Sequence, residues 1–105
     1  MALTVQDALD HLHIDYADEV VEKNVARALS TGIALMKGAV GEDVETYLPG
    51  DPRIDDLVLL RTAEVYDERS SSGKAGAAKN GLADLLETQL RLELRMAKEE
   101  AGVGV

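Results

Sequence analysis

The sequence predicts an all-α protein, and three observations support this. Aromatic residues make up only 3% of the 105 residues, so the core consists of Leu, Val, Ile, Ala and Met, a set that favours helices over strands. Apolar residues recur at intervals of three and four along most of the chain, and no segment alternates as a strand does. We therefore expect one domain over residues 1–105, a small bundle of about four helices, one short and three longer.

The first two predicted helices begin at capping residues. Thr4 is suited to cap a helix over residues 5–13, with Asp7 three positions later as in a capping box. Asp15 is the next cap candidate and predicts a second helix that runs to about Lys37. The apolar residues of this second helix fall on one arc and make it the clearest amphipathic helix in the chain: Ala17, Val21, Val25, Ala28, Leu29, Gly32, Ile33, Leu35 and Met36.

The second half of the chain is divided by two glycine-bearing segments. Residues 41–50 are predicted as a loop, and the Asp-Pro pair at 51–52 then starts a third helix that runs to about Arg69. Apolar residues lie almost all round this helix, which should therefore be the central, most buried one. Residues 70–81 are small, polar and rich in glycine, so we expect a mobile loop there and a last helix over 82–101.

The net charge of −9 is unevenly distributed. Residues 1–22 hold no Lys or Arg and six acidic residues: Asp7, Asp10, Asp15, Asp18, Glu19 and Glu22. Such a surface repels phosphate, so ordinary DNA binding is not expected. It is suited instead to line a passage through which DNA slides, to dock on a basic partner, or simply to keep the protein soluble.

Composition also excludes several classes of protein. The lack of cysteine excludes disulfides, thiolate nucleophiles and cysteine zinc sites. Polar residues follow the first methionine closely, so no signal peptide is predicted. The longest apolar stretches, 33–36 and 57–60, are too short to cross a bilayer. We expect a soluble intracellular protein that has no contact with membranes.

His11 and His13 are the only histidines and raise the question of a metal site. On a helix, residues two apart point about 200° from each other, so the pair would share a metal only in an extended chain. A helix C-terminus beside the Asp15 cap is the better interpretation of this stretch, because histidine complements the helix dipole there. We predict no metal and no catalytic residue. The alternative, a small metal-dependent enzyme that uses both histidines, would require bound metal in the purified protein.

The Gly73-Lys74 pair is similar to part of a phosphate-binding loop, but its surroundings do not fit. Glu68 stands where the first glycine of that motif belongs, and Ala75 replaces the Ser or Thr. A flexible linker is the better interpretation, and no cofactor is predicted.

The last predicted helix carries two apolar rows. One row is Leu85, Leu92 and Met96, the other is Leu86, Leu90, Leu94 and Ala97, and between them lie Gln89 and Glu93. A helix that serves one small core rarely needs two rows divided by a carboxylate. We predict that one row packs on the chain's own helices and the other on a neighbouring subunit, with the candidate interface Leu85, Gln89, Leu92, Glu93 and Met96. The alternative is a wide, partly exposed helix.

Two stretches carry a family pattern. Residues 3–19, LTVQDALDHLHIDYADE, have Leu-Thr, an Ala-containing helix, His-Leu and then Ile-Asp before an acidic helix start. Residues 57–73, LVLLRTAEVYDERSSSG, have an aliphatic run followed by Tyr66 and Arg69 before a loop. In these features the chain resembles the head–tail connectors of tailed phages, the small head-completion adaptors. The second helix and residues 74–105 show no matching residues.

The resemblance implies a structural protein without enzymatic activity. Members of that family form a ring, commonly of twelve subunits, beneath the portal, and join it to the tail or to further head-completion proteins while DNA passes through the centre. The implied location is the head–tail junction of the virion, and the host cytoplasm during assembly. We expect the loop to order on docking with the portal or tail, with the candidate docking residues Ser70, Ser71, Ser72, Gly73 and Lys74.

The concentration of acid in residues 1–22 keeps a second hypothesis open. A small acidic regulator, such as an antitoxin or a DNA mimic, would bind a basic partner through that surface. Such a regulator would be a monomer or dimer, whereas a connector forms rings.

Overall fold

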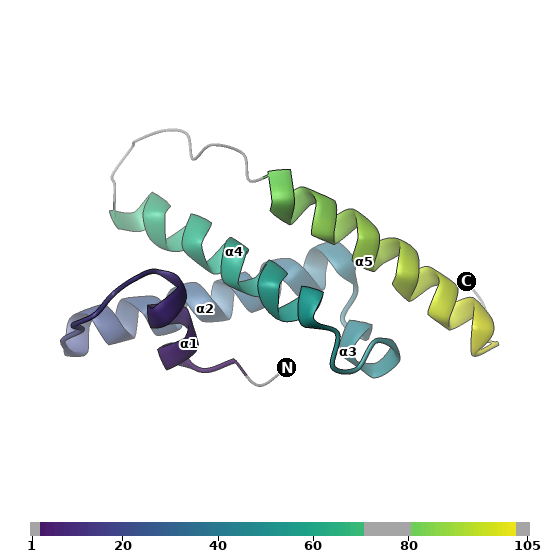
Figure 1. Cartoon of the computed structure of the whole chain (residues 1–105), viewed down its shortest axis with the longest axis horizontal. Coiled ribbons are helices and arrows are strands. Elements are labelled where there is room, and N and C mark those ends of the chain that lie inside the picture. Colours follow the sequence, from purple (N-terminus) through teal and green to yellow (C-terminus); the bar gives the residue numbers. More distant parts are fainter. Residues whose placement is uncertain (1–2, 71–80, 103–105) are drawn as a thin grey trace.

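Five helices make up the part of the chain that the structure, a computed structural model, describes: residues 3–70 and 81–102. They are α1 (Val5–His11), α2 (Glu19–Val40), α3 (Val44–Tyr47), α4 (Pro52–Ser70) and α5 (Gly81–Glu100) (Figure 1). No strand occurs in these two ranges, so the all-α prediction is confirmed. The molecule is elongated, with extents of 48 × 27 × 16 Å.

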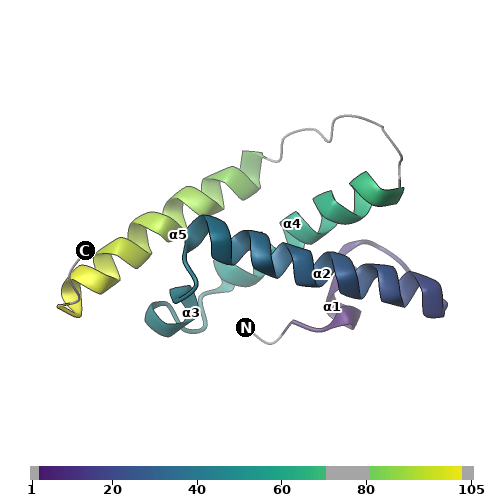
Figure 2. The same cartoon turned by 180° about the vertical axis from the view of Figure 1, so that it is seen from behind.

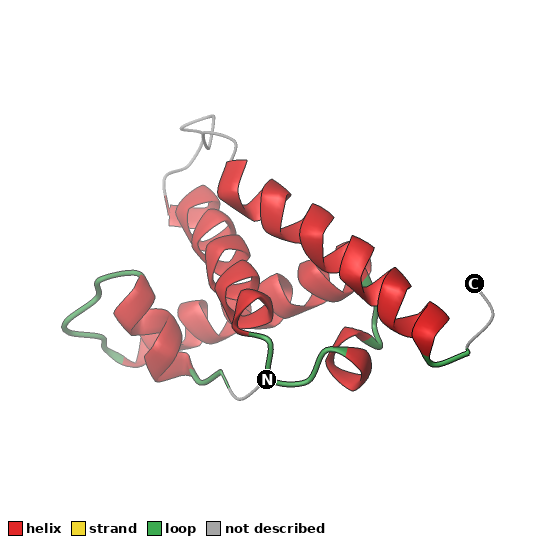
Figure 3. Cartoon of the chain, turned by 45° about the vertical axis from the view of Figure 1, so that its right-hand side comes forward, coloured by secondary structure: helices red, strands yellow, loops and turns green. Residues whose placement is uncertain are grey.

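Helix α4, predicted as the central helix, shares the centre of the arrangement with α2. These two helices pack along each other, and each of them also contacts α1 and α5 (Figures 1 and 2). The main core lies between α2, α4 and α5, where Met36, Leu57 and Leu90 are fully buried. A smaller cluster around Ala8, Leu9 and Val25 holds α1 against α2. The C-terminal half of α5 extends past α4 to reach α3 (Figure 3).

Helices α2 and α4 cross closely at a glycine. Gly32 faces Thr62, whose side chain is 1% exposed and donates a hydrogen bond of 2.7 Å from its Oγ1 to the carbonyl oxygen of Val58. A Cβ at position 32 would lie 3.0 Å from both the Thr62 nitrogen and the Val58 oxygen, and closer still to Thr62 Oγ1. The absence of a side chain at Gly32 is therefore what lets the two helices approach.

The helix starts follow the capping rules, with one shift from prediction. Thr4 and Asp7 form the capping box of α1, in which the Asp7 nitrogen donates to Thr4 Oγ1 at 3.2 Å. Helix α2 begins later than predicted, because Asp18 rather than Asp15 is its N-cap and accepts from the Val21 nitrogen at 2.9 Å. Residue 52 is the first of α4, as the Asp-Pro pair predicted.

Three further boundaries differ from prediction, and burial accounts for two of them. Helix α2 continues through Gly38 to Val40, because the extra turn brings Val40 into the core, and Gly41 ends it with a φ of 146°. The predicted loop at 41–50 contains α3, because Val44 is fully buried there. Helix α1 ends at His11, two residues early, where Leu12 caps it and His13 takes a positive φ of 59°.

Candidate functional site

The two rows of α5 have opposite environments. Leu86, Leu90 and Leu94 are buried against α2 and α4. The other row, Leu85, Leu92 and Met96, is 53%, 57% and 54% exposed, and we call it the outer row. Leu86, Leu90 and Leu94 already supply the contacts of α5 with the core. The outer row is therefore apolar surface that the described part of the chain does not cover.

The carboxylate between the rows has a partner on α4. Glu93 forms an ion pair with Arg53, whose Nη2 lies 2.7 Å from Glu93 Oε1. Arg53 also binds Asp51, with 2.6 Å between Arg53 Nη2 and Asp51 Oδ2. The hydrogen bonds from Arg53 hold the pKa of Glu93 and the pKa of Asp51 below their ordinary values. Glu93, predicted as an interface residue, thus ties the last helix to its own bundle.

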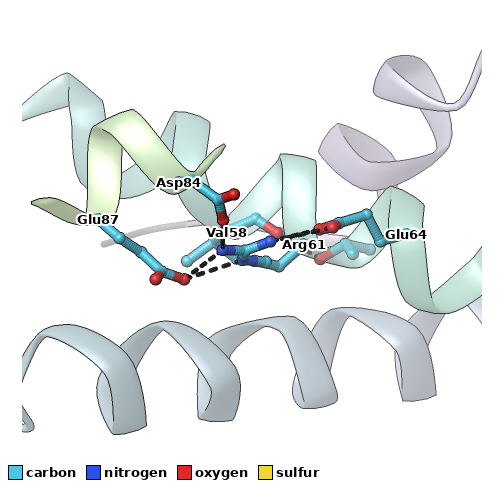
Figure 4. A network of polar contacts seen from close by, with 6 residues as sticks. Val58, Arg61, Glu64, Asp84 and Glu87 are labelled. Atoms are coloured by element: carbon cyan, nitrogen blue, oxygen red, sulfur yellow. Dashed lines mark hydrogen bonds and ion pairs between the residues drawn. The ribbon is translucent and has the colours of Figure 1, made fainter. Parts of the chain in front are cut away.

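A second arginine of α4 holds the first half of α5. Arg61 binds Glu64 of its own helix at 2.7 Å, and from α5 it binds Glu87 at 3.0 Å and Asp84 at 3.1 Å (Figure 4). Burial opposes the charge on Arg61, but the hydrogen bonds with these carboxylates outweigh it and raise the pKa of the guanidinium. Arg61 stays charged and fixes α5 against α4.

The C-terminal half of α5 is held by α3. Lys98 Nζ lies 2.7 Å from Asp43 Oδ2 and 5.8 Å from the centre of the Tyr47 ring. An open groove of about 500 Å³ lies along this half of α5. It is lined by Leu48, Glu93, Met96, Ala97, Glu99 and Glu100. Met96 belongs both to the groove and to the outer row, so the two form one continuous surface.

The connection between α1 and α2, together with the first turn of α2, forms the other notable surface. Tyr16 is 86% exposed and Val20 is 65% exposed, unusually high values for large apolar side chains. Acidic residues surround them, namely Asp15, Asp18 and Glu19, all exposed. We call these five residues the acidic tip.

The histidines of the sequence do not gather a metal site. His11 and His13 are both exposed, and His11 lies in the last turn of α1, where it complements the helix dipole. Among residues 3–70 and 81–102, no three His, Asp or Glu side chains lie together in an arrangement that suits a metal ion.

Compared with protein-family models, with curated proteins and with solved structures, the chain matches none. Its fold and surfaces therefore carry the functional argument. In the described ranges, no helix is both long enough and apolar enough to span a bilayer.

The predicted docking loop falls largely outside the described residues. Ser70 is the last residue of α4 rather than the first of a loop, which corrects the predicted boundary. Ser71, Ser72, Gly73 and Lys74 lie outside the described ranges.

Sequence reasoning identified the acidic residues of the tip but missed the exposed Tyr16 and Val20 and the two arginine clusters. Adjacent residues on a helix point about 100° apart, and Val20 falls outside the apolar arc that contains Val21. The exposure of Val20 could therefore have been predicted from its position on the helix, whereas no local pattern in the sequence indicates that Tyr16 is exposed. Arg53 and Arg61 find their partners 40 and 26 residues away, a separation that periodicity does not reveal.

Proposed function

We propose that this chain is a structural virion protein, a single-domain head–tail connector that forms a ring under the portal and joins the capsid to the tail. The observation that carries the proposal is the outer row of α5, which stays exposed although the same helix already completes the core. The resemblance of residues 3–19 and 57–73 to the connector family adds to it. The role is one of assembly, without catalysis, cofactor or metal.

A ring places specific demands on its subunit, and these surfaces fit them. Each subunit needs two different faces that complement each other. The outer row supplies one apolar face on a helix held by Arg53, Arg61 and Lys98. The acidic surface of residues 1–22 suits a passage through which DNA slides without sequence-specific binding, because like charges repel.

A second candidate function rests on the acidic tip. Its exposed Tyr16 among carboxylates is the kind of surface with which an acidic regulator would engage a basic protein. A regulator would need only that one surface, and the outer row would remain without a role. The two functions therefore differ in whether the outer row is required.

Electron microscopy of the purified protein, alone and with a portal protein, tests the proposal, with sedimentation velocity as the quantitative readout. We expect rings, formed alone or on the portal, that are lost when Leu85 and Leu92 are both changed to Ser. Leu35→Ser is the matched control, because Leu35 is an exposed leucine on α2 that does not belong to the outer row. A chain that stays monomeric at every concentration and binds no portal would refute the connector function. A monomer that captures a basic protein would support the regulator instead.

A further inference from the structure

Two exposed apolar surfaces lie in different parts of the molecule and cannot meet within one chain. The acidic tip is at the end of the long axis formed by the α1–α2 connection, and α5 extends toward the opposite end (Figures 1 and 2). Tyr16 and Val20 form the apolar part of the tip, and the outer row forms that of α5.

The charge of the tip is uniformly negative. Asp15, Asp18 and Glu19 surround Tyr16 and Val20, and the sequence has no Lys or Arg before Lys23. One carboxylate oxygen of Asp18 accepts the hydrogen bond that caps α2, and Asp18 remains exposed. A partner for this surface therefore needs an apolar patch bordered by positive charge.

The α5 surface has this character. The carboxylates of Glu87 and Glu93 are ion-paired with Arg61 and Arg53 of α4, although each arginine also binds a further carboxylate. Arg91 and Arg95 are exposed on the ridge beside the outer row, and Arg95 has only a long contact of 3.9 Å to Glu99. Arg91 and Arg95 therefore place two positive charges beside the middle of the outer row, whereas Asp84, Glu99 and Glu100 are exposed toward the two ends of α5.

We propose that the acidic tip of one copy of this chain docks on the outer row of the next, with Tyr16 and Val20 against Leu85, Leu92 and Met96, and Asp15 and Glu19 facing Arg91 and Arg95. A contact between two different surfaces of identical chains is heterologous, so it propagates from copy to copy and closes into a ring when the rotation permits. A contact between the α5 helices of two copies would instead leave the acidic tip exposed, and the negative charge of the tip would not contribute to binding. The inference rests on the proposed function and identifies the two faces that a ring requires.

Reciprocal charge reversal tests the pairing. The tip variant carries Asp15→Arg and Glu19→Arg, and retains Asp18 because it caps α2. The helix variant carries Arg91→Glu and Arg95→Glu, which leave the pairs of Arg53, Arg61 and Lys98 intact. The control variant, Glu42→Arg with Asp56→Arg, has the same net charge as the tip variant but changes exposed residues outside both surfaces. Circular dichroism verifies that each variant is folded.

We expect each one-sided variant to self-associate about 100-fold more weakly than the wild-type chain, because like charges then face each other. Mixing the two variants in equal amounts should restore assembly, since each tip then meets an α5 of opposite charge. The control variant should assemble normally. Assembly that survives tip reversal, or that fails to return in the mixture, overturns this pairing and leaves the connector function standing. A wild-type chain that never assembles, alone or on a portal, removes both.

Discussion

Because α2 and α4 cross closely, we expect two Gly→Ala substitutions in α2 to have opposite effects on the stability of the fold. Gly32 and Gly38 both lie inside α2, where replacing glycine by alanine normally stabilises a helix by about 0.5–1 kcal/mol. At Gly38 an added Cβ would meet no atom within 4 Å apart from the neighbouring residues and backbone of its own helix, so Gly38→Ala should show that gain. At Gly32 the added Cβ meets backbone atoms at 3.0 Å and also the Thr62 hydroxyl.

For Gly32→Ala, the cost of overpacking the helix crossing should exceed the gain in helix propensity. Overpacking a core with one extra carbon costs roughly 1–3 kcal/mol. Moving Thr62 aside to make room would also break its 2.7 Å hydrogen bond to Val58 and leave a buried hydroxyl unsatisfied. We therefore expect Gly32→Ala to lower the free energy of unfolding by about 1–2 kcal/mol, after subtraction of the helix-propensity gain.

Urea unfolding at low protein concentration, followed by circular dichroism, measures both effects under identical conditions. Adding Thr62→Ala to Gly32→Ala should recover only part of the loss, because the backbone contacts at 3.0 Å remain. If Gly32→Ala were as stabilising as Gly38→Ala, the helices would not be in contact at Thr62, and the crossing described above would be wrong.

Two further predictions concern α5. Leu90 is fully buried whereas Leu92 is 57% exposed, so Leu90→Ala should destabilise by about 2–5 kcal/mol and Leu92→Ala by less than about 0.5 kcal/mol in urea unfolding of the dilute monomer. Equal losses would contradict the assignment of the two rows. Because the hydrogen bonds from Arg53 lower the pKa of Glu93 in the folded chain, the pair stabilises the fold at neutral pH, and that contribution is lost as the pH falls through the lowered pKa of Glu93. The urea midpoint of the wild-type chain should therefore fall more steeply with acid than that of Arg53→Met, and parallel pH profiles would disprove the coupling.

Local signals in the sequence predicted much of the fold. The capping box at Thr4 and the Asp-Pro start of α4 depend on residues a few positions apart, and both occur as predicted. The division of α5 into two rows follows from a periodicity that lies within one helix. Asp15 and Asp18 are equally good caps by residue type, so residue type alone does not select Asp18, which caps α2 in the structure. The short α3 exists because Val44 is buried, and burial depends on distant residues.

The candidate site was only partly predictable for the same reason. The carboxylate of Glu93 between two apolar rows indicated that something other than core packing acted there, and sequence reasoning assigned it to a subunit interface. The structure pairs it with Arg53, from the first turn of α4, forty residues earlier. Such a partner follows from how α4 and α5 pack, which no pattern within α5 contains.

In the proposed assembly, the arginine clusters contribute to association as well as to stability. A surface that is fixed before it binds loses less conformational entropy on association than one that must first be ordered. Arg61 attaches the first half of α5 and Arg53 the second half to the same rigid helix, while Lys98 attaches its end to α3. Individually, partly exposed ion pairs contribute little to folding. Their position on both sides of Leu92 holds the outer row in one orientation, so the apolar area it offers to a second chain is available without a prior ordering step.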